Sequence, residues 1–160
     1  MRRTFLFAFI CLLSLTSPGC RLRDRGLAKL QVVEDLTLGT HMEDIKQQWF
    51  LYSPKRLVVD TSMSTEKDIV YRGVSRDPAV TAMFFFFNSR TKILHQVEWR
   101  YHSSMTAFKE KELLEHWTKK LWPPELHHRW EGRVYVWRDR KAELDLYLAD
   151  GICHLIQKLD

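Results

Sequence analysis

The chain has 160 residues, and its 25 lysines and arginines outnumber its 20 aspartates and glutamates, which gives a formal net charge of +5 at pH 7. The two signs are interspersed along the chain, and this pattern argues against a nucleic-acid-binding surface. Removal of an N-terminal leader leaves about 140 residues, enough for one domain with a hydrophobic core.

Residues 1–19 have the layout of a secretory signal peptide. Arg2 and Arg3 form a charged start, residues 4–16 are mostly apolar, and residues 17–19 are small or turn-forming. The apolar run has roughly 12 residues, whereas a membrane-spanning helix needs about 20. We therefore expect an export signal rather than a transmembrane helix.

The segment that ends at Cys20 resembles a bacterial lipobox, in which a small residue precedes a cysteine that becomes lipidated. Gly19 matches the small residue, whereas Ser17 and Pro18 differ from the usual pattern. The resemblance implies that Cys20 is a palmitate-carrying lipidation site, because several acyl chains anchor a protein stably in a membrane. Arg21, in place of aspartate, implies the outer membrane of a bacterial envelope, with the protein facing the periplasm. The alternative is ordinary cleavage, which yields a soluble periplasmic protein.

Cys153 is left without a pairing partner if Cys11 leaves with the leader and Cys20 is lipidated. It is then expected to be a small buried hydrophobe in a strand. If Cys20 is not lipidated, a disulfide between Cys20 and Cys153 becomes possible. Residues 20–35 are expected to form the tether between the membrane and the folded part.

The rest of the chain predicts two helices and eight strands. Thr40 and Glu43 have the spacing of a capping box, and Met42, Ile45 and Trp49 follow on one helical face. A second helix is expected at residues 105–121. Strands are expected at 57–61, 68–73, 82–87, 92–101, 126–130, 133–138, 142–148 and 152–159, with a tight hairpin turn at Asp150-Gly151.

The two halves of this pattern resemble each other. The segment 82–87 matches 142–147, and Ile93-x-His95-x-Val97 matches Ile152-x-His154-x-Ile156 in the same order along the chain. We therefore predict an α+β fold of two tandem helix-plus-antiparallel-sheet repeats, residues 36–102 and 103–160, in one compact domain. Each sheet is expected to bury one face under its own helix.

Residues 36–45, from Leu36 to Ile45, resemble the opening of small envelope lipoproteins. These include the small lipoprotein of the outer-membrane barrel-assembly machinery, and the tandem pattern is similar to the fold of the β-lactamase inhibitor protein. The resemblance implies a protein that binds other proteins or stabilises assemblies. It carries over no functional residue.

Sequence motifs for catalysis are lacking. There is no G-x-S-x-G, H-E-x-x-H or C-x-x-C, and six glycines leave little for phosphate-binding loops. We expect no enzyme and no cofactor. His127 and His128 are the best metal candidates, but adjacent residues of a strand point to opposite faces and cannot chelate together. His95 and His154 are expected to be half-buried and hydrogen-bonded.

Alternation along the strands predicts an aromatic surface on the sheet face away from the helices. Its members are Tyr71, Phe85, Phe87, Tyr135, Trp137 and Tyr147. A surface of large apolar groups usually meets a partner, and Tyr and Trp are typical binding anchors. The alternative is that other segments of the chain cover it.

The function expected from these features is a membrane-anchored envelope lipoprotein that binds or stabilises a protein partner through the aromatic face. One alternative is an anchored or soluble periplasmic enzyme that uses a metal at His127 and His128. Another is a carrier of lipids or small ligands, with the aromatic face as its apolar floor.

Overall fold

The computed structural model describes residues 32–33, 36–52, 57–75, 77–102, 106–130 and 132–159. The predicted signal peptide and Cys20 lie outside these ranges. In chain order the elements are β1 (Val32–Val33), β2 (Leu36–Thr37), α2 (Met42–Tyr52), β3 (Val58–Val59), β4 (Asp68–Gly73), β5 (Val80–Asn88), β6 (Leu94–Tyr101), α3 (Thr106–Lys120), β7 (Glu125–Arg129), β8 (Gly132–Arg138), β9 (Ala142–Ala149) and β10 (Ile152–Leu159).

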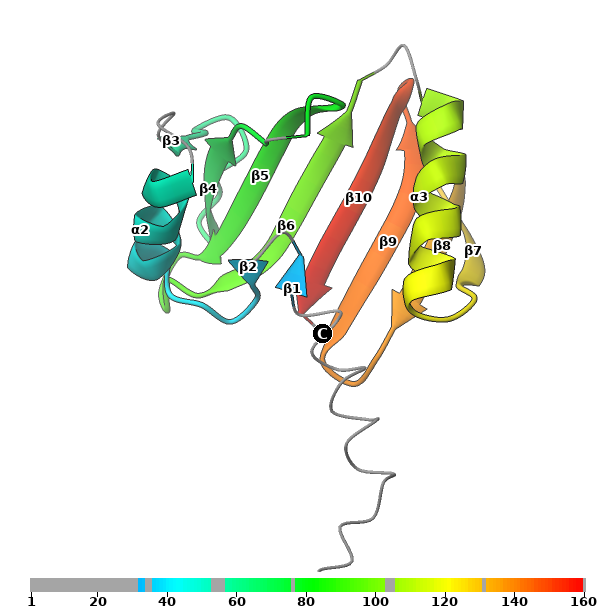
Figure 1. The fold of residues 1–160 in the computed structure, drawn as a ribbon. Coiled ribbons are helices and arrows are strands. Elements are labelled where there is room, and N and C mark those ends of the chain that lie inside the picture. The colour runs from blue at the N-terminus through cyan, green and yellow to red at the C-terminus, as the bar shows by residue number, and fades with distance from the viewer. Residues whose placement is uncertain are drawn as a thin grey trace, which may run out of the picture.

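The prediction of two tandem helix-plus-antiparallel-sheet repeats is wrong, because the strands of residues 36–102 and 103–160 form one antiparallel sheet. Its order is β3-β4-β5-β6-β10-β9-β8-β7, and among the described strands β1 and β2 form a separate pair (Figure 1). β6 and β10 pair directly, with Trp99 opposite Leu155 and Arg100 opposite His154. The sequence pattern predicted where the strands lie but not which strands pair. Two separate sheets would leave β6 and β10 as edge strands with unpaired backbone N–H and C=O groups, and the β6–β10 pairing satisfies both rows.

The positions of most elements agree with the sequence pattern. β4 and β10 coincide with the predicted segments 68–73 and 152–159. The turn between β9 and β10 is formed by Asp150 and Gly151, with φ angles of 50° and 71°. Two successive left-handed residues are the requirement of a type I′ hairpin turn, so this prediction is confirmed.

The predicted capping box of α2 is not formed. The Thr40 hydroxyl and the Thr40 N–H both donate to the carbonyl of Thr37, at 2.7 Å and 3.3 Å, and the Glu43 carboxylate accepts from Lys46 instead of from the Thr40 N–H. His41 caps the helix instead, because its carbonyl accepts from the N–H of Ile45 at 3.2 Å and its ring Nδ1 lies 3.4 Å from the N–H of Glu43.

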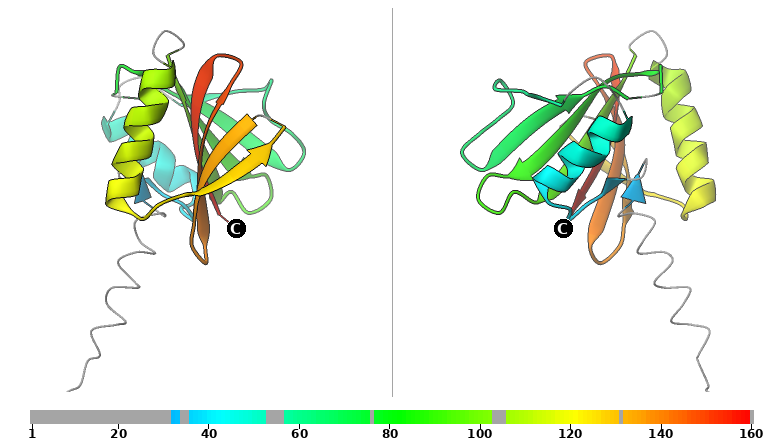
Figure 2. Two further views of the ribbon diagram at one scale, coloured as in Figure 1. Left: turned by 90° about the vertical axis from the view of Figure 1, so that its right-hand side faces the viewer. Right: turned by 60° about the vertical axis from the view of Figure 1, so that its left-hand side comes forward.

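Both described helices lie on the same face of the sheet, α2 near β4 and α3 near β9, as the three views show together (Figures 1 and 2). α2 contributes Ile45 and Trp49 to the core between them and the sheet, and α3 contributes Leu113 and Trp117. The sheet contributes mainly large side chains: Met83, Phe85, Phe87, Leu94, Val97, Trp99, Tyr101, Trp137, Leu144, Leu146, Cys153 and Leu155.

The opposite face of the sheet carries a different set of side chains. A small apolar cluster of Val70, Ala82 and Phe84 lies at its β4–β5 end, packed against Met63. Charged and polar residues occupy much of the remainder, and the buried ones among them are Glu98, Glu143, Asp145 and His154. The sheet therefore separates an aromatic core from a layer of ion pairs.

Candidate functional site

The predicted aromatic surface does not lie on the open face of the sheet. Phe85, Phe87 and Trp137 are in the core under the helices, each with 0 % of its surface exposed. Tyr71 and Tyr135 are half-buried and pack against that same core. Tyr147 alone of the six projects from the opposite face, where its ring stacks on His154 with a centroid distance of 4.9 Å.

The error in the assignment of the faces is a one-residue slip. Matching the segment 82–87 to 142–147 aligned Phe84 with Leu144 and so placed Phe84 in the core. The core residue is Phe85, and β5 pairs with β6 through register shifts at both of its ends. Because side chains alternate with a period of two, a slip of one residue moves every side chain of a strand to the other face.

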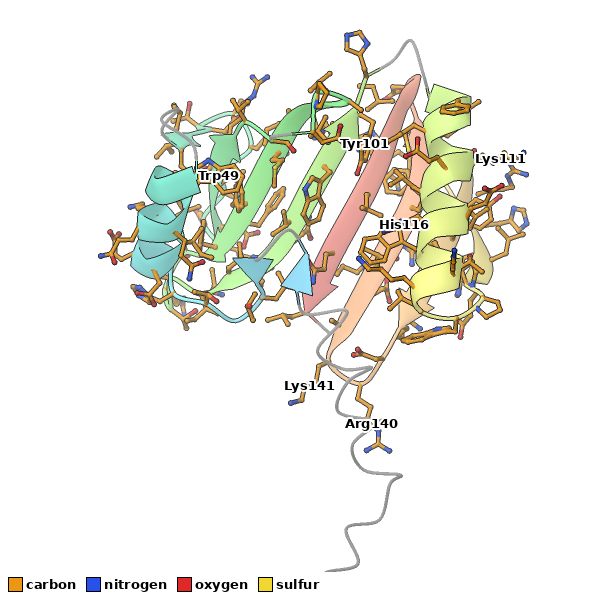
Figure 3. All side chains as sticks on the ribbon, in the orientation of Figure 1. Trp49, Tyr101, Lys111, His116, Arg140 and Lys141 are labelled. Carbon is orange, nitrogen blue, oxygen red and sulfur yellow. The ribbon has the colours of Figure 1, made fainter. Side chains whose placement is uncertain are left out.

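A cleft of about 250 Å³ lies between α3 and the middle of the sheet. Figure 3 shows His116 on the side of α3 that is turned toward the middle of the molecule and Tyr101 near the end of β6, while Lys111 projects from the opposite side of α3. The residues that line the cleft come from the β4–β5 loop, β6, α3 and β10: Asp77, Trp99, Tyr101, Lys109, Glu112, Leu113, His116, Trp117, Lys120 and Leu155.

Aromatic rings form much of the cleft wall. Trp99 and Trp117 are 1 % and 6 % exposed, so their ring edges are fixed by packing. The Lys109 ammonium lies 5.4 Å from the centroid of the Tyr101 ring, and the Lys120 ammonium lies 5.1 Å from that of Trp117. Both distances allow a cation–π attraction, which holds the two lysine side chains against the cleft wall.

The charges around the cleft balance. Lys109 lies 3.0 Å from a carboxylate oxygen of Glu112 and 3.8 Å from one of Asp77. Lys120 supplies the second cation. Partial desolvation, followed by the positive charge of Lys120, lowers the pKa of His116 and so favours the neutral imidazole, which can both donate and accept a hydrogen bond. The cleft thus combines apolar walls with polar groups of both signs.

The histidines that the sequence singled out are held by carboxylates. His95 lies 2.8 Å from Asp68, and His154 lies 2.9 Å from Glu98, which confirms the expected hydrogen bonds. His127 and His128 are adjacent in β7, and His127 lies 3.0 Å from Glu125. In the described part of the chain, no three His, Cys, Asp or Glu side chains are grouped as metal ligands.

The open face is dominated by a buried acidic pair, Glu143 and Asp145, under three cations. Lys158 reaches both carboxylates, at 2.7 Å and 3.0 Å, Arg129 also bonds to both, and Arg138 bonds to Glu143. Burial raises the pKa of Glu143, but hydrogen bonds from Lys158 and Arg138 outweigh burial and bring the pKa to about 2. Burial and the Glu143 charge raise the pKa of Asp145.

Sequence reasoning missed the cleft, although a signal for it was present. Lys109, Leu113, His116, Trp117 and Lys120 recur at helical spacing, and so mark one edge of α3 where lysines and histidine alternate with core residues. The comparisons with known proteins add no residue to it, since no family model, no curated protein and no solved structure matches this chain. Neither described helix has the length and apolar run needed to cross a membrane.

Proposed function

We propose that this chain is an exported protein, anchored in the bacterial envelope through a lipidated Cys20, whose folded part binds a protein partner. The leader, the lipobox resemblance and the resemblance of residues 36–45 to small envelope lipoproteins support the location. The cleft beside α3 supports the binding, and it replaces the open aromatic surface as the candidate site. The aromatic-walled cleft is the observation that carries this proposal.

The size of the cleft favours one side chain of a partner over a free ligand. Its volume is about 250 Å³, whereas pockets for small molecules usually span roughly 300–1,000 Å³. A carrier of acyl chains needs a longer apolar cavity than this.

The chemistry of the lining indicates the kind of partner. Trp99, Trp117 and Leu155 form the floor of the cleft with 1–6 % of their surfaces exposed, and an aromatic or branched aliphatic side chain would contact these exposed parts. Desolvated anchors of this kind supply most of the energy in protein interfaces. Lys120 and Glu112 at the same site suit charged groups that flank the anchor on the partner. The partner is therefore an envelope protein with an exposed apolar side chain among charges of both signs.

Site-specific photocrosslinking in living cells tests the binding site. A photoreactive amino acid at Lys120, which lines the cleft, should form a discrete crosslinked product. The same residue at Lys111 is the matched control, because Lys111 lies on the other side of α3 with 77 % of its side chain exposed (Figure 3). The product should weaken when Glu112→Lys reverses a charge of the cleft. Equal crosslinking from both positions, or no effect of Glu112→Lys in a folded protein, refutes the cleft as the site.

Metabolic labelling with palmitate tests the anchor separately. The full chain should incorporate label, and Cys20→Ala should abolish it. An unlabelled chain that still crosslinks from Lys120 refutes the anchor and leaves the binding site standing.

A further inference from the structure

β7 is an exposed edge of the sheet. The strand order ends at β7, and in the left view of Figure 2 this edge faces the viewer with no helix in front of it. Leu126 within β7 and Trp130 just after it are 53 % and 93 % exposed. The other edge, β3, has only two residues, whereas β7 has five. A longer edge with exposed apolar side chains is a template for pairing with another strand.

We propose that two copies of this chain pair through their β7 strands, antiparallel and centred on His127, so that the sheet continues from one copy into the other. In this register Glu125 of each copy lies opposite Arg129 of the other, and Leu126 lies opposite His128. In this register the numbers of two opposite residues differ by zero, two or four, and side chains alternate with a period of two. Each side chain therefore faces one that lies on the same face of the joined sheet.

Charge complementarity selects a second copy as the occupant. A twofold axis at His127 forms the Glu125–Arg129 pair twice, because the edge carries an acid and a base at equal distances from its centre. Glu125 has 68 % of its side chain exposed beside its 3.0 Å contact with His127, and Arg129 retains 32 % exposure beside its bonds to Glu143 and Asp145. An unrelated strand would have to supply both charges in the opposite order.

The neighbouring registers that keep the faces matched are less favourable. Centring on His128 places Arg129 opposite His127 and leaves Glu125 without a cation across the interface. Centring on Leu126 places Pro124, which has no N–H, opposite His128. The register centred on His127 instead places Pro124 at the end of the ladder, opposite the exposed Trp130.

Disulfide trapping of the full chain tests the register. His127→Cys brings two thiols directly opposite each other, at a Cα separation of about 4.5–5.5 Å that a disulfide can bridge. Leu126→Cys and His128→Cys are the matched controls. In the proposed register each of these residues lies two positions away from the same residue of the other copy, so the two thiols are not directly opposite. Mild oxidation should give a dimer with His127→Cys, several-fold more than with either control or with the unsubstituted chain.

A charge reversal on β7 tests the complementarity. Glu125→Arg added to His127→Cys places Arg opposite Arg129 and should reduce the trapped dimer several-fold, whereas Glu115→Arg on α3 should leave it unchanged. The proposal is overturned if His127→Cys traps no more than the unsubstituted chain, if a control traps more, or if the product contains a different protein. Sedimentation of the unsubstituted full chain in detergent is independent of any variant, and a monomer at every concentration also overturns the proposal.

Discussion

Substitution of Glu143 by Gln should destabilise the protein by removing one charge from the open face. The Glu143 side chain is 4 % exposed and accepts hydrogen bonds from Arg138, Lys158 and Arg129. Burial raises its pKa, but the bonds from Lys158 and Arg138 prevail and lower the pKa from 4.5 to about 2. Gln keeps the shape of the side chain and removes its charge, so three cations lose a counter-charge.

The size of the effect follows from the pKa. A shift of about 2.5 pH units corresponds to about 3 kcal/mol in favour of the charged form. The three cations are 31–45 % exposed, so water compensates part of the loss. Removing Glu143 also relieves its repulsion of Asp145, whose pKa it raises. We therefore expect Glu143→Gln to lower the free energy of unfolding at pH 7 by about 1–2 kcal/mol.

The pH dependence has a definite sign. A carboxyl group with a lowered pKa stabilises the folded state above its unfolded pKa of 4.5, and this contribution is lost as the pH falls towards about 2. The free energies of unfolding in urea of Glu143→Gln and of the unsubstituted chain should therefore differ by the full amount of about 1–2 kcal/mol at pH 7 and by clearly less at pH 3.

The matched control is Glu115→Gln, because Glu115 is 70 % exposed and lies 3.9 Å from Lys111. Exposed pairs of this kind contribute at most about 0.5 kcal/mol. A difference between Glu143→Gln and the unsubstituted chain that stays constant from pH 7 to pH 3, or that does not exceed the effect of Glu115→Gln, would refute the reasoning.

Three further predictions concern packing, reactivity and a turn. Gly73→Ala should lower the melting temperature through an overpacking cost of about 1–3 kcal/mol, because an added Cβ would lie 2.9 Å from the Phe85 ring and 3.0 Å from Leu57. Burial raises the pKa of Cys153 to about 12, so its thiol should resist alkylation by iodoacetamide at pH 8 until the protein is unfolded, and rapid labelling of folded protein would contradict this. Asp139→Ala should lower the free energy of unfolding in urea by about 1 kcal/mol, because the carboxylate accepts hydrogen bonds from the backbone N–H groups of Lys141 and Ala142 at 2.8 Å and 2.9 Å. An unchanged urea midpoint would contradict this role.

The sequence predicted the elements well and their arrangement poorly, for a physical reason. Helices, strands and turns are specified by neighbouring residues. Asp150 and Gly151 adopt the left-handed angles of a hairpin turn, and alternation of apolar and polar residues is enough to predict a strand. The arrangement depends on which edges pair. Nothing in β6 or β10 alone indicates that Arg100 lies opposite His154, because each segment would pair equally well in a separate sheet.

The candidate site was mispredicted for the same reason. Four consecutive phenylalanines, Phe84 to Phe87, are compatible with either face, and the choice rests on a register that the local pattern does not contain. The cleft depends on the position of α3 over β9 and β10, which brings His116 and Lys120 beside Trp99 across a long separation in sequence. Helical spacing marked the edge of α3 but not the surface it faces.

The distribution of charges favours a binding site on the helix side of the sheet over one on the open face. Buried carboxylates are tolerated only when hydrogen-bond donors satisfy them, and Glu98 is satisfied by Arg100 at 2.6 Å and by the ring of His154 at 2.9 Å. A partner that docks on the open face would have to desolvate Arg100, Arg129 and Lys158 without offering a better acid than the carboxylate each already holds. In the cleft beside α3 an apolar anchor would contact Trp99 and Trp117, and the charged groups around it, Lys109 and Glu112, already pair with each other. Partner binding is therefore expected on the helix side of the sheet and at the β7 edge, and the ion-paired face is expected to stay in contact with water.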